Sequence, residues 1–161
     1  MSKKKHPIIF IVEDNKAYNK IVEHHLNSNG YPNTYPFASG EEALKQLYLK
    51  PNIIIQDYKL QGMSGLTVLQ RVKKVLPNTE FIFLSGQDNI EIAVNTVKYG
   101  AFDYILKTET ALQRLIQKID TITNFQQLKR SKQKYFIAAY IFLAILVILL
   151  FLIIFTTQMS R

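Results

Sequence analysis

The stretch NIIIQD at residues 52–57 places three consecutive isoleucines just before a carboxylate, and it decides the fold. A short continuous apolar run is typical of a strand buried on both faces, as strands are in a parallel sheet covered by helices. Further strand-like runs occur on either side of it along the chain. We expect strands at residues 8–12, 33–37, 52–56, 80–84 and 102–106.

Amphipathic stretches of helical periodicity separate these runs. Ser39 and Ser64 stand where helix N-caps are expected, and Gly100 stands where a helix should end. The expected helices are residues 16–28, 40–48, 66–76, 90–99 and 111 to about 122. This alternation of strand and helix predicts an α/β fold, a five-stranded doubly wound parallel sheet of the flavodoxin-like type.

The C-terminal part of the chain has a different composition. Residues 136–155 read FIAAYIFLAILVILLFLIIF, twenty residues without a charge. As a helix they would reach about 30 Å, the thickness of the hydrocarbon core of a bilayer. A buried core helix would keep a polar face, which this segment lacks. We therefore predict a single transmembrane helix at residues 135–157, joined to a soluble domain at residues 1–122 by a basic juxtamembrane linker or helical stalk at residues 123–134.

The basic residues indicate how the chain is oriented. Four of them precede the apolar run and one follows it: Lys129, Arg130, Lys132, Lys134 and Arg161. The positive-inside rule then places the soluble domain in the cytoplasm and leaves residues 158–161 as a short non-cytoplasmic tail. The net charge is +8, and residues 123–161 contribute five basic residues and no acidic one. A membrane explains this excess better than nucleic acid, and no DNA-binding helix pair follows the soluble domain.

Several kinds of site are missing from the sequence. The chain has no cysteine, which excludes disulfides and thiol chemistry. Neither GxGxxG nor GxxxxGK[ST] follows the first strand, so dinucleotide and P-loop sites are not expected. The three histidines, His6, His24 and His25, fit a solvated surface better than a metal site.

Residues able to bind a metal or an anion stand just after four of the expected strands. They are Glu13, Asp14, Asp57, Ser85 and Lys107. Parallel strands bring these positions to one edge of the sheet. Three carboxylates there would repel one another without a cation, and Mg²⁺ prefers such oxygen ligands. With Lys107 and Ser85 to hold an anion, the set predicts a phosphoryl site with a carboxylate nucleophile.

Four motifs carry a resemblance to a known family: VEDN at residues 12–15, QDYKLQGMSG at 56–65, FLSGQ at 83–87 and AVNTVKYGAFDYILK at 93–107. In this order and spacing they make residues 7–122 similar to the receiver domain of bacterial response regulators, of the chemotaxis-receiver type. The resemblance implies a phosphoprotein of two-component signalling. Together with the apolar segment, it implies a single-pass protein of the bacterial cytoplasmic membrane.

The resemblance also implies residue roles. Asp57 would be the phospho-acceptor, Ser85 and Lys107 would bind the phosphoryl group, and Ser85 with Tyr104 would form the conformational switch. The residues expected to bind Mg²⁺ are Glu13, Asp14, Asp57 and, through its backbone carbonyl, Lys59. The phosphoryl donor would be a histidine kinase or a histidine phosphotransfer protein, and output would pass to an unknown downstream protein. The chain would take part in its own phosphorylation and dephosphorylation without being an enzyme.

Two positions depart from the family pattern. Receivers commonly have a proline after the lysine, often in a cis bond, whereas this chain has Thr108. A cis bond before a non-proline residue costs about 3 kcal/mol, so we expect a trans bond there. Lys59 stands two residues after Asp57, where its long cationic side chain can reach the phosphoryl group and alter hydrolysis.

Two other functions remain open at the level of sequence. One is an aspartate-based phosphatase of the haloacid dehalogenase type, but its general acid would have to be Lys59, which is unsuited to that role at neutral pH. The other is a pseudo-receiver, a membrane-bound interaction module that is not phosphorylated. A small phosphodonor with Mg²⁺ separates the pseudo-receiver from a working receiver.

Overall fold

The computed structural model describes residues 6–159 of the chain. The chain divides into two compact units, Met1–Ile122 and Thr123–Arg161. The first unit contains the sheet and the helices around it, and the described residues of the second unit, 123–159, continue the last helix.

Five parallel strands form one sheet in the order β2-β1-β3-β4-β5. They are β1 (Ile9–Val12), β2 (Thr34–Phe37), β3 (Ile53–Gln56), β4 (Glu80–Ser85) and β5 (Asp103–Leu106). Each begins and ends within one residue of its expected bounds, so the prediction of a five-stranded parallel sheet is confirmed. All four residues of β1 and of β3 are buried, because these strands lie inside the sheet and helices cover both faces.

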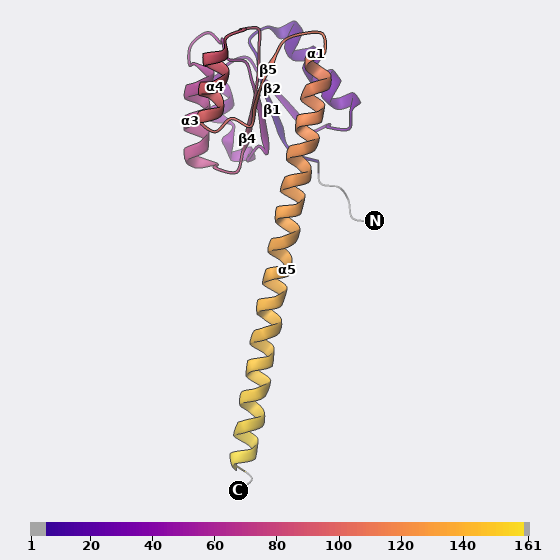
Figure 1. Cartoon of the computed structure of the whole chain (residues 1–161), viewed down its shortest axis with the longest axis vertical. Coiled ribbons are helices and arrows are strands. Elements are labelled where there is room, and N and C mark those ends of the chain that lie inside the picture. The colour runs from indigo at the N-terminus through magenta and orange to yellow at the C-terminus, as the bar shows by residue number, and fades with distance from the viewer. Residues whose placement is uncertain (1–5, 160–161) are drawn as a thin grey trace. The chain divides into compact units, whose positions relative to one another are not determined.

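Helices cover the two faces of the sheet (Figure 1). They are α1 (Lys16–Ser28), α2 (Gly40–Lys45), α3 (Gly65–Val75), α4 (Ile90–Lys98) and α5 (Ala111–Met159), with a 3-10 helix η1 (Leu47–Leu49) after α2. Alternate residues of β1 point to opposite faces of the sheet. On one face Ile9 and Ile11 pack with α1 and α5, and on the other Phe10 and Val12 pack with α2 and α3.

Polar caps fix the helix boundaries. The Oδ1 atom of Asn15 accepts from two backbone N–H groups of the first turn of α1, and Ser39 and Ser64 cap α2 and α3 as expected. Gly100 follows α4 with a φ of +98°, which its lack of a Cβ allows. The expectation of one helix to residue 48 is wrong: α2 ends at Lys45 and the chain continues as η1.

The helix α5 begins in the first unit and continues into the second. The linker or stalk at residues 123–134 stays a prediction. Up to Ile122 its inner residues are buried against the sheet. Among the described residues, 111–148 form one helix that is long and apolar enough to cross a membrane, judged by length and composition only. Its apolar stretch is not buried inside the protein. Of the predicted tail, residues 160–161 lie outside the described residues.

Candidate functional site

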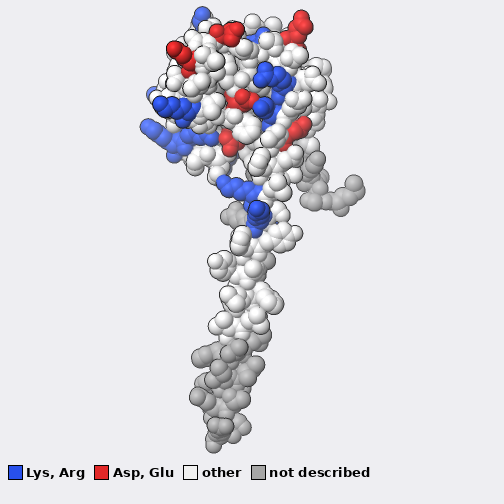
Figure 2. Space-filling model, in the orientation of Figure 1, with Lys and Arg blue, Asp and Glu red and all other residues white. Residues whose placement is uncertain are grey.

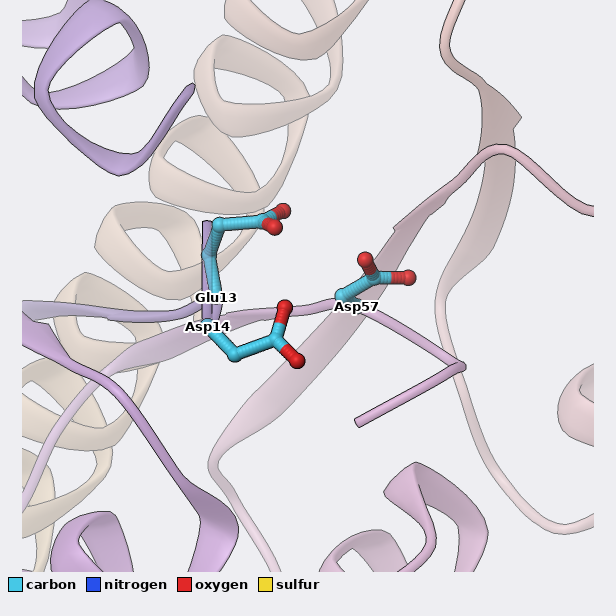
Figure 3. Close-up of side chains that lie close together, drawn as sticks. All are labelled: Glu13, Asp14 and Asp57. Carbon is cyan, nitrogen blue, oxygen red and sulfur yellow. The ribbon is translucent and has the colours of Figure 1, made fainter. Parts of the chain in front are cut away.

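Three carboxylates meet at the carboxyl ends of β1 and β3. Because Val12 pairs with Gln56 in the sheet, the next residues, Glu13 and Asp57, come side by side. Glu13 and Asp57 are buried and Asp14 is exposed. One oxygen from each of the three carboxylates lies within 4.8 Å of the others, and Figure 3 shows the three side chains pointing into one space. The three acids that the sequence analysis singles out therefore lie together, and nothing in the sequence indicates that Asp14 is exposed while the other two are buried.

Lys107 lies just after β5 and crosses the sheet edge to reach two of these acids. Its Nζ atom is 2.6 Å from Glu13 Oε2 and 2.7 Å from Asp57 Oδ2. Burial alone would lower the pKa of Lys107, but hydrogen bonds and charge from both acids more than offset this and raise it. Burial raises the pKa of Glu13, with Lys107 acting in the opposite direction. The ammonium therefore provides part of the positive charge that the acidic cluster requires.

The acceptor candidate, Asp57, is held by its neighbours. Its Oδ1 accepts from the backbone N–H of Lys59 at 3.2 Å, while the exposed side chain of Lys59 lies outside these contacts. The side-chain amide of Gln56 donates to the backbone carbonyl of Asp57 at 2.8 Å. Gly65 packs so closely that an added Cβ would lie 2.9 Å from the same carbonyl oxygen. Asp57 thus has a fixed backbone and a side chain aimed at Lys107.

The two predicted switch residues both contact the backbone of Gln87. The Oγ atom of buried Ser85 accepts from the backbone N–H of Gln87 at 3.2 Å, and the hydroxyl of Tyr104 donates to the carbonyl of Gln87 at 2.7 Å. The Tyr104 ring stacks on Phe83 with centroids 6.3 Å apart. Burial raises the pKa of Tyr104, so its hydroxyl keeps its proton at neutral pH. The backbone of Gln87 therefore connects Ser85, at its N–H, with Tyr104, at its carbonyl.

The peptide bond before Thr108 is trans, as expected, since the described residues contain no cis peptide bond. The loop is held instead by a bond from Lys107 N to the carbonyl of Ser85 at 2.9 Å. The backbone of Lys107 is thus anchored next to Ser85 without a proline.

Sequence reasoning missed two residues of the site. Tyr18 places its ring 4.6 Å from Lys107 Nζ, a cation–π contact that limits where the ammonium can go. Asn19 is buried and donates to the backbone carbonyls of Glu13 and Phe37, which ties the ends of β1 and β2 together. A signal existed for Tyr18, because it stands four residues before Val22 and therefore on the inner face of α1.

The acidic cluster fits a magnesium ion. Its donors are carboxylate oxygens, which Mg²⁺ prefers, and the exposed side of Asp14 leaves room for the water ligands that Mg²⁺ usually keeps. Glu13, Asp14 and Asp57 would hold the ion, which would supply positive charge beside the attacking carboxylate. The ligand role of the Lys59 carbonyl stays a prediction.

Comparison with known proteins decides the family. Residues 9–120 match the response regulator receiver domain. The chain belongs to this family. Receiver domains are phospho-acceptors in two-component signalling and generally use Mg²⁺ at an acidic pocket, which the cluster at Glu13 matches. Membership also implies a histidine kinase or phosphotransfer protein as partner.

The relatives are larger proteins that contain a receiver. The chain is 38% identical over 102 residues to a protein named as an NtrX-like response regulator of Rickettsia felis. It is 33% identical over 101 residues to the DNA-binding transcriptional regulator NtrC of Klebsiella pneumoniae. Each alignment covers 62% of this chain and 21% of the relative, so the chain spans about a fifth of their length.

Solved structures agree with this assignment. NtrX from Brucella abortus superposes with a TM-score of 0.72 at 29% identity, over 80% of this chain and 29% of that one. A CheY-like receiver domain protein from Methanospirillum hungatei superposes with a TM-score of 0.71 at 26% identity, over 78% of this chain and 99% of that one.

Proposed function

We propose that this receiver is tethered to the bacterial cytoplasmic membrane and takes a phosphoryl group on Asp57 from a phosphohistidine of its kinase or phosphotransfer partner. The observation that carries the proposal is the geometry around Asp57. Its Oδ2 lies 2.7 Å from Lys107 Nζ, inside a cluster of three carboxylates that suits Mg²⁺. Such a carboxylate is positioned to act as a nucleophile and has cations to offset the charge of a phosphoryl group.

The transfer follows from these positions. An oxygen of Asp57 attacks the phosphorus, the phosphorus–nitrogen bond of the phosphohistidine breaks, and the electron pair of that bond returns to the imidazole. Lys107 remains beside the new acyl phosphate and balances its charge. Bound Mg²⁺ would supply further neutralisation of the phosphoryl oxygens. Asp57 is regenerated when water hydrolyses the acyl phosphate, and we do not expect turnover of other substrates.

The switch follows from the shared partner of Ser85 and Tyr104. A phosphoryl oxygen on Asp57 is charged and therefore a strong acceptor, so the Ser85 hydroxyl would turn toward it and donate. Its contact with the N–H of Gln87 would then break, and the backbone of Gln87, whose carbonyl accepts from Tyr104, would shift. The surface around α4 and β5 would change as a result and alter contacts with a downstream protein.

The test is the intact mass of the protein after incubation with acetyl phosphate and Mg²⁺. We expect an added phosphoryl group in the wild type and none in Asp57→Asn. The matched control is Asp88→Asn, which makes the same chemical change at an exposed aspartate after β4 and should keep the adduct. An adduct that survives in Asp57→Asn would refute the assignment. No adduct in the wild type, with kinase-dependent transfer also absent, would favour a pseudo-receiver.

The membrane part of the proposal rests on residues 135–157. Support comes from the length and composition of the helix and from the basic residues before it, which favour a cytoplasmic receiver. We propose residues 1–122 as the receiver, 123–134 as the linker or stalk and 158–161 as the outer tail. Deleting residues 123–161 should abolish recovery with membranes and leave phosphorylation intact. If the truncated protein, residues 1–122, still sediments with membranes, the proposed tether is wrong.

A further inference from the structure

The sheet edge where the strands begin lies opposite the phosphorylation site, and we call it the exit edge. It carries the loops at residues 46–52, 76–79 and 99–102, which lead into β3, β4 and β5. These three strands are neighbours, so their loops lie next to one another. The hydroxyl of Tyr31, just before β2, donates to the carboxylate of Asp120 on α5. The receiver part of α5 therefore ends at this same edge, and the chain leaves the receiver here.

Lysines are concentrated at the exit edge. Two of them are neutralised by ion pairs, Lys73 with Glu80 at 3.3 Å and Lys118 with Asp103 at 2.7 Å. Four others are exposed, and within the part of the chain that the structure describes none of them lies within 4.0 Å of a carboxylate. These are Lys45, Lys50, Lys74 and Lys98. A lysine near a helix C-terminus stabilises that helix, but Lys50 lies beyond η1 and needs another explanation.

Exposed apolar side chains stand among these lysines. Tyr48 in η1 is 72% exposed, Val75 at the end of α3 is 66% exposed and Tyr99 just after α4 is 50% exposed. The ends of α3 and α4 are close together, because a Cβ added to Gly100 would lie 3.8 Å from the Cε of Lys73. In Figure 2 basic side chains gather over the α3–α4 side of the receiver. We call the following set the exit-edge patch: Lys45, Tyr48, Lys50, Lys74, Lys98 and Tyr99.

We propose that the exit-edge patch binds the surface of an anionic bilayer. Lysine beside tyrosine is the composition of membrane–water interfaces, where the ammonium contacts lipid phosphate and the ring lies at headgroup level. The opposite edge holds the acidic cluster of Glu13, Asp14 and Asp57, so an anionic surface attracts one edge and repels the other. The docked receiver keeps its phosphorylation site turned away from the membrane and open to the kinase.

The tether makes this weak contact effective, so the inference rests on the proposed membrane anchor. Twelve residues, 123–134, separate the receiver from the predicted span. They reach about 18 Å as a helix and about 40 Å when extended, which keeps the patch within reach of the headgroups. Each lysine near an anionic leaflet favours the docked state about fivefold. An acidic protein in solution would have to compete for the exit-edge patch with the membrane surface, which the tether keeps nearby at all times.

The test uses the full chain in vesicles that contain nitroxide-labelled quencher lipid. Because the chain has no cysteine, Asn78→Cys in the exposed loop after α3 takes a single fluorophore. A matched label at Glu109→Cys lies after β5 at the opposite edge and is also exposed. With phosphatidylglycerol present we expect quenching at residue 78 and little at residue 109. Quenching at residue 78 should fall in vesicles of pure phosphatidylcholine. It should also fall in 1 M salt, because the Debye length is then only about 3 Å.

The patch itself is tested with paired lysine variants. Lys74→Gln with Lys98→Gln should lower the ratio of docked to free receiver about 25-fold. Lys16→Gln with Lys20→Gln removes the same charge from exposed positions of α1 and should leave quenching unchanged. Equal quenching in all variants, or quenching at residue 78 that does not depend on anionic lipid, would overturn the proposal. Flotation distinguishes failure of the docking from failure of the membrane anchor. If the chains float with the vesicles but show no quenching, the anchor is present and the docking is absent. If the chains do not float, the anchor itself is absent.

Discussion

Replacing Lys107 by methionine tests the electrostatics of the site most sharply. In the wild type the ammonium lies 2.6 Å from Glu13 and 2.7 Å from Asp57, and the side chains of both acids are nearly buried, at 6% and 10% exposure. Methionine keeps most of the volume and removes the charge. The carboxylates, with oxygens within 4.8 Å of one another, then face each other without a cation.

The cost follows from that separation. Two like charges no more than 4.8 Å apart repel by at least about 3 kcal/mol at an effective dielectric constant of about 20. Removing one partner of a buried ion pair typically costs about 3–5 kcal/mol, and Lys107 has a side-chain exposure of 19%, so the lower end applies. We expect the receiver fragment, residues 1–122, to lose about 3 kcal/mol. For a domain of this size that is a fall of about 10 °C in Tm.

Thermal unfolding followed by circular dichroism in EDTA, and then in Mg²⁺, checks this prediction. Mg²⁺ should raise the Tm of Lys107→Met more than that of the wild type, because the variant site is more negative. Lys20→Met, an exposed lysine of α1, is the control and should change stability by less than about 0.5 kcal/mol. A loss of under 1 kcal/mol in EDTA, or no stabilisation by Mg²⁺, would refute the view of Lys107 as the cation of an acidic cluster.

The same variant has a pH signature. The pKa of Lys107 is raised above its usual 10.5 by hydrogen bonds to Asp57 and Glu13, which outweigh the lowering effect of burial. Its stabilisation is therefore complete below pH 10.5 and is lost as the pH rises through the higher folded pKa. The stability difference between wild type and Lys107→Met should be constant from pH 7 to 10 and should shrink above that range.

Three further predictions concern single contacts. Burial raises the pKa of Glu13 above 4.5, so the folded state binds this proton more tightly than the unfolded state does. The free energy of unfolding should therefore fall as the pH rises from 4.5 through the folded pKa. In urea unfolding without Mg²⁺, this fall should be smaller for Glu13→Gln than for the wild type. Gly65→Ala should cost about 2 kcal/mol, since the new Cβ would lie 2.8 Å from Phe83 Cε1, and an unchanged urea midpoint would contradict this packing. Tyr104→Phe removes the hydroxyl that donates to Gln87 and should cost about 1 kcal/mol in the same assay.

The strands and caps could be predicted because their signals are local. The isoleucines of β3 are buried on both faces, and nothing but a central strand suits such a run. Ser39 and Ser64 accept backbone N–H groups as isolated N-caps do. The helical segment as a whole ends at Lys50, which takes a left-handed φ of 53° just before Pro51, because proline disfavours a helical residue before it. The change from α2 to η1 after Lys45 has no comparable signal in the sequence.

The contacts of the site were only partly predictable. Topology places Lys107 at the right edge, but β5 is two strands away from β3, and only the direction of the side chain brings its ammonium to Asp57. The ring of Tyr18 over that ammonium depends on how α1 packs. Ser85 and Tyr104 both contact the backbone of Gln87. Every residue has the same backbone atoms, so the sequence carries no signal for these contacts.

The central claim is that Asp57 carries the phosphoryl group, and chemical trapping tests it most directly. The protein is treated with acetyl phosphate and Mg²⁺, then with borohydride, which reduces an aspartyl phosphate to homoserine, and the peptides are sequenced by mass spectrometry. We expect homoserine at residue 57 alone, and none when EDTA replaces Mg²⁺ or when Lys107→Met is used at low phosphodonor. Homoserine at Asp14 or Asp88 with Asp57 unmodified would contradict the account.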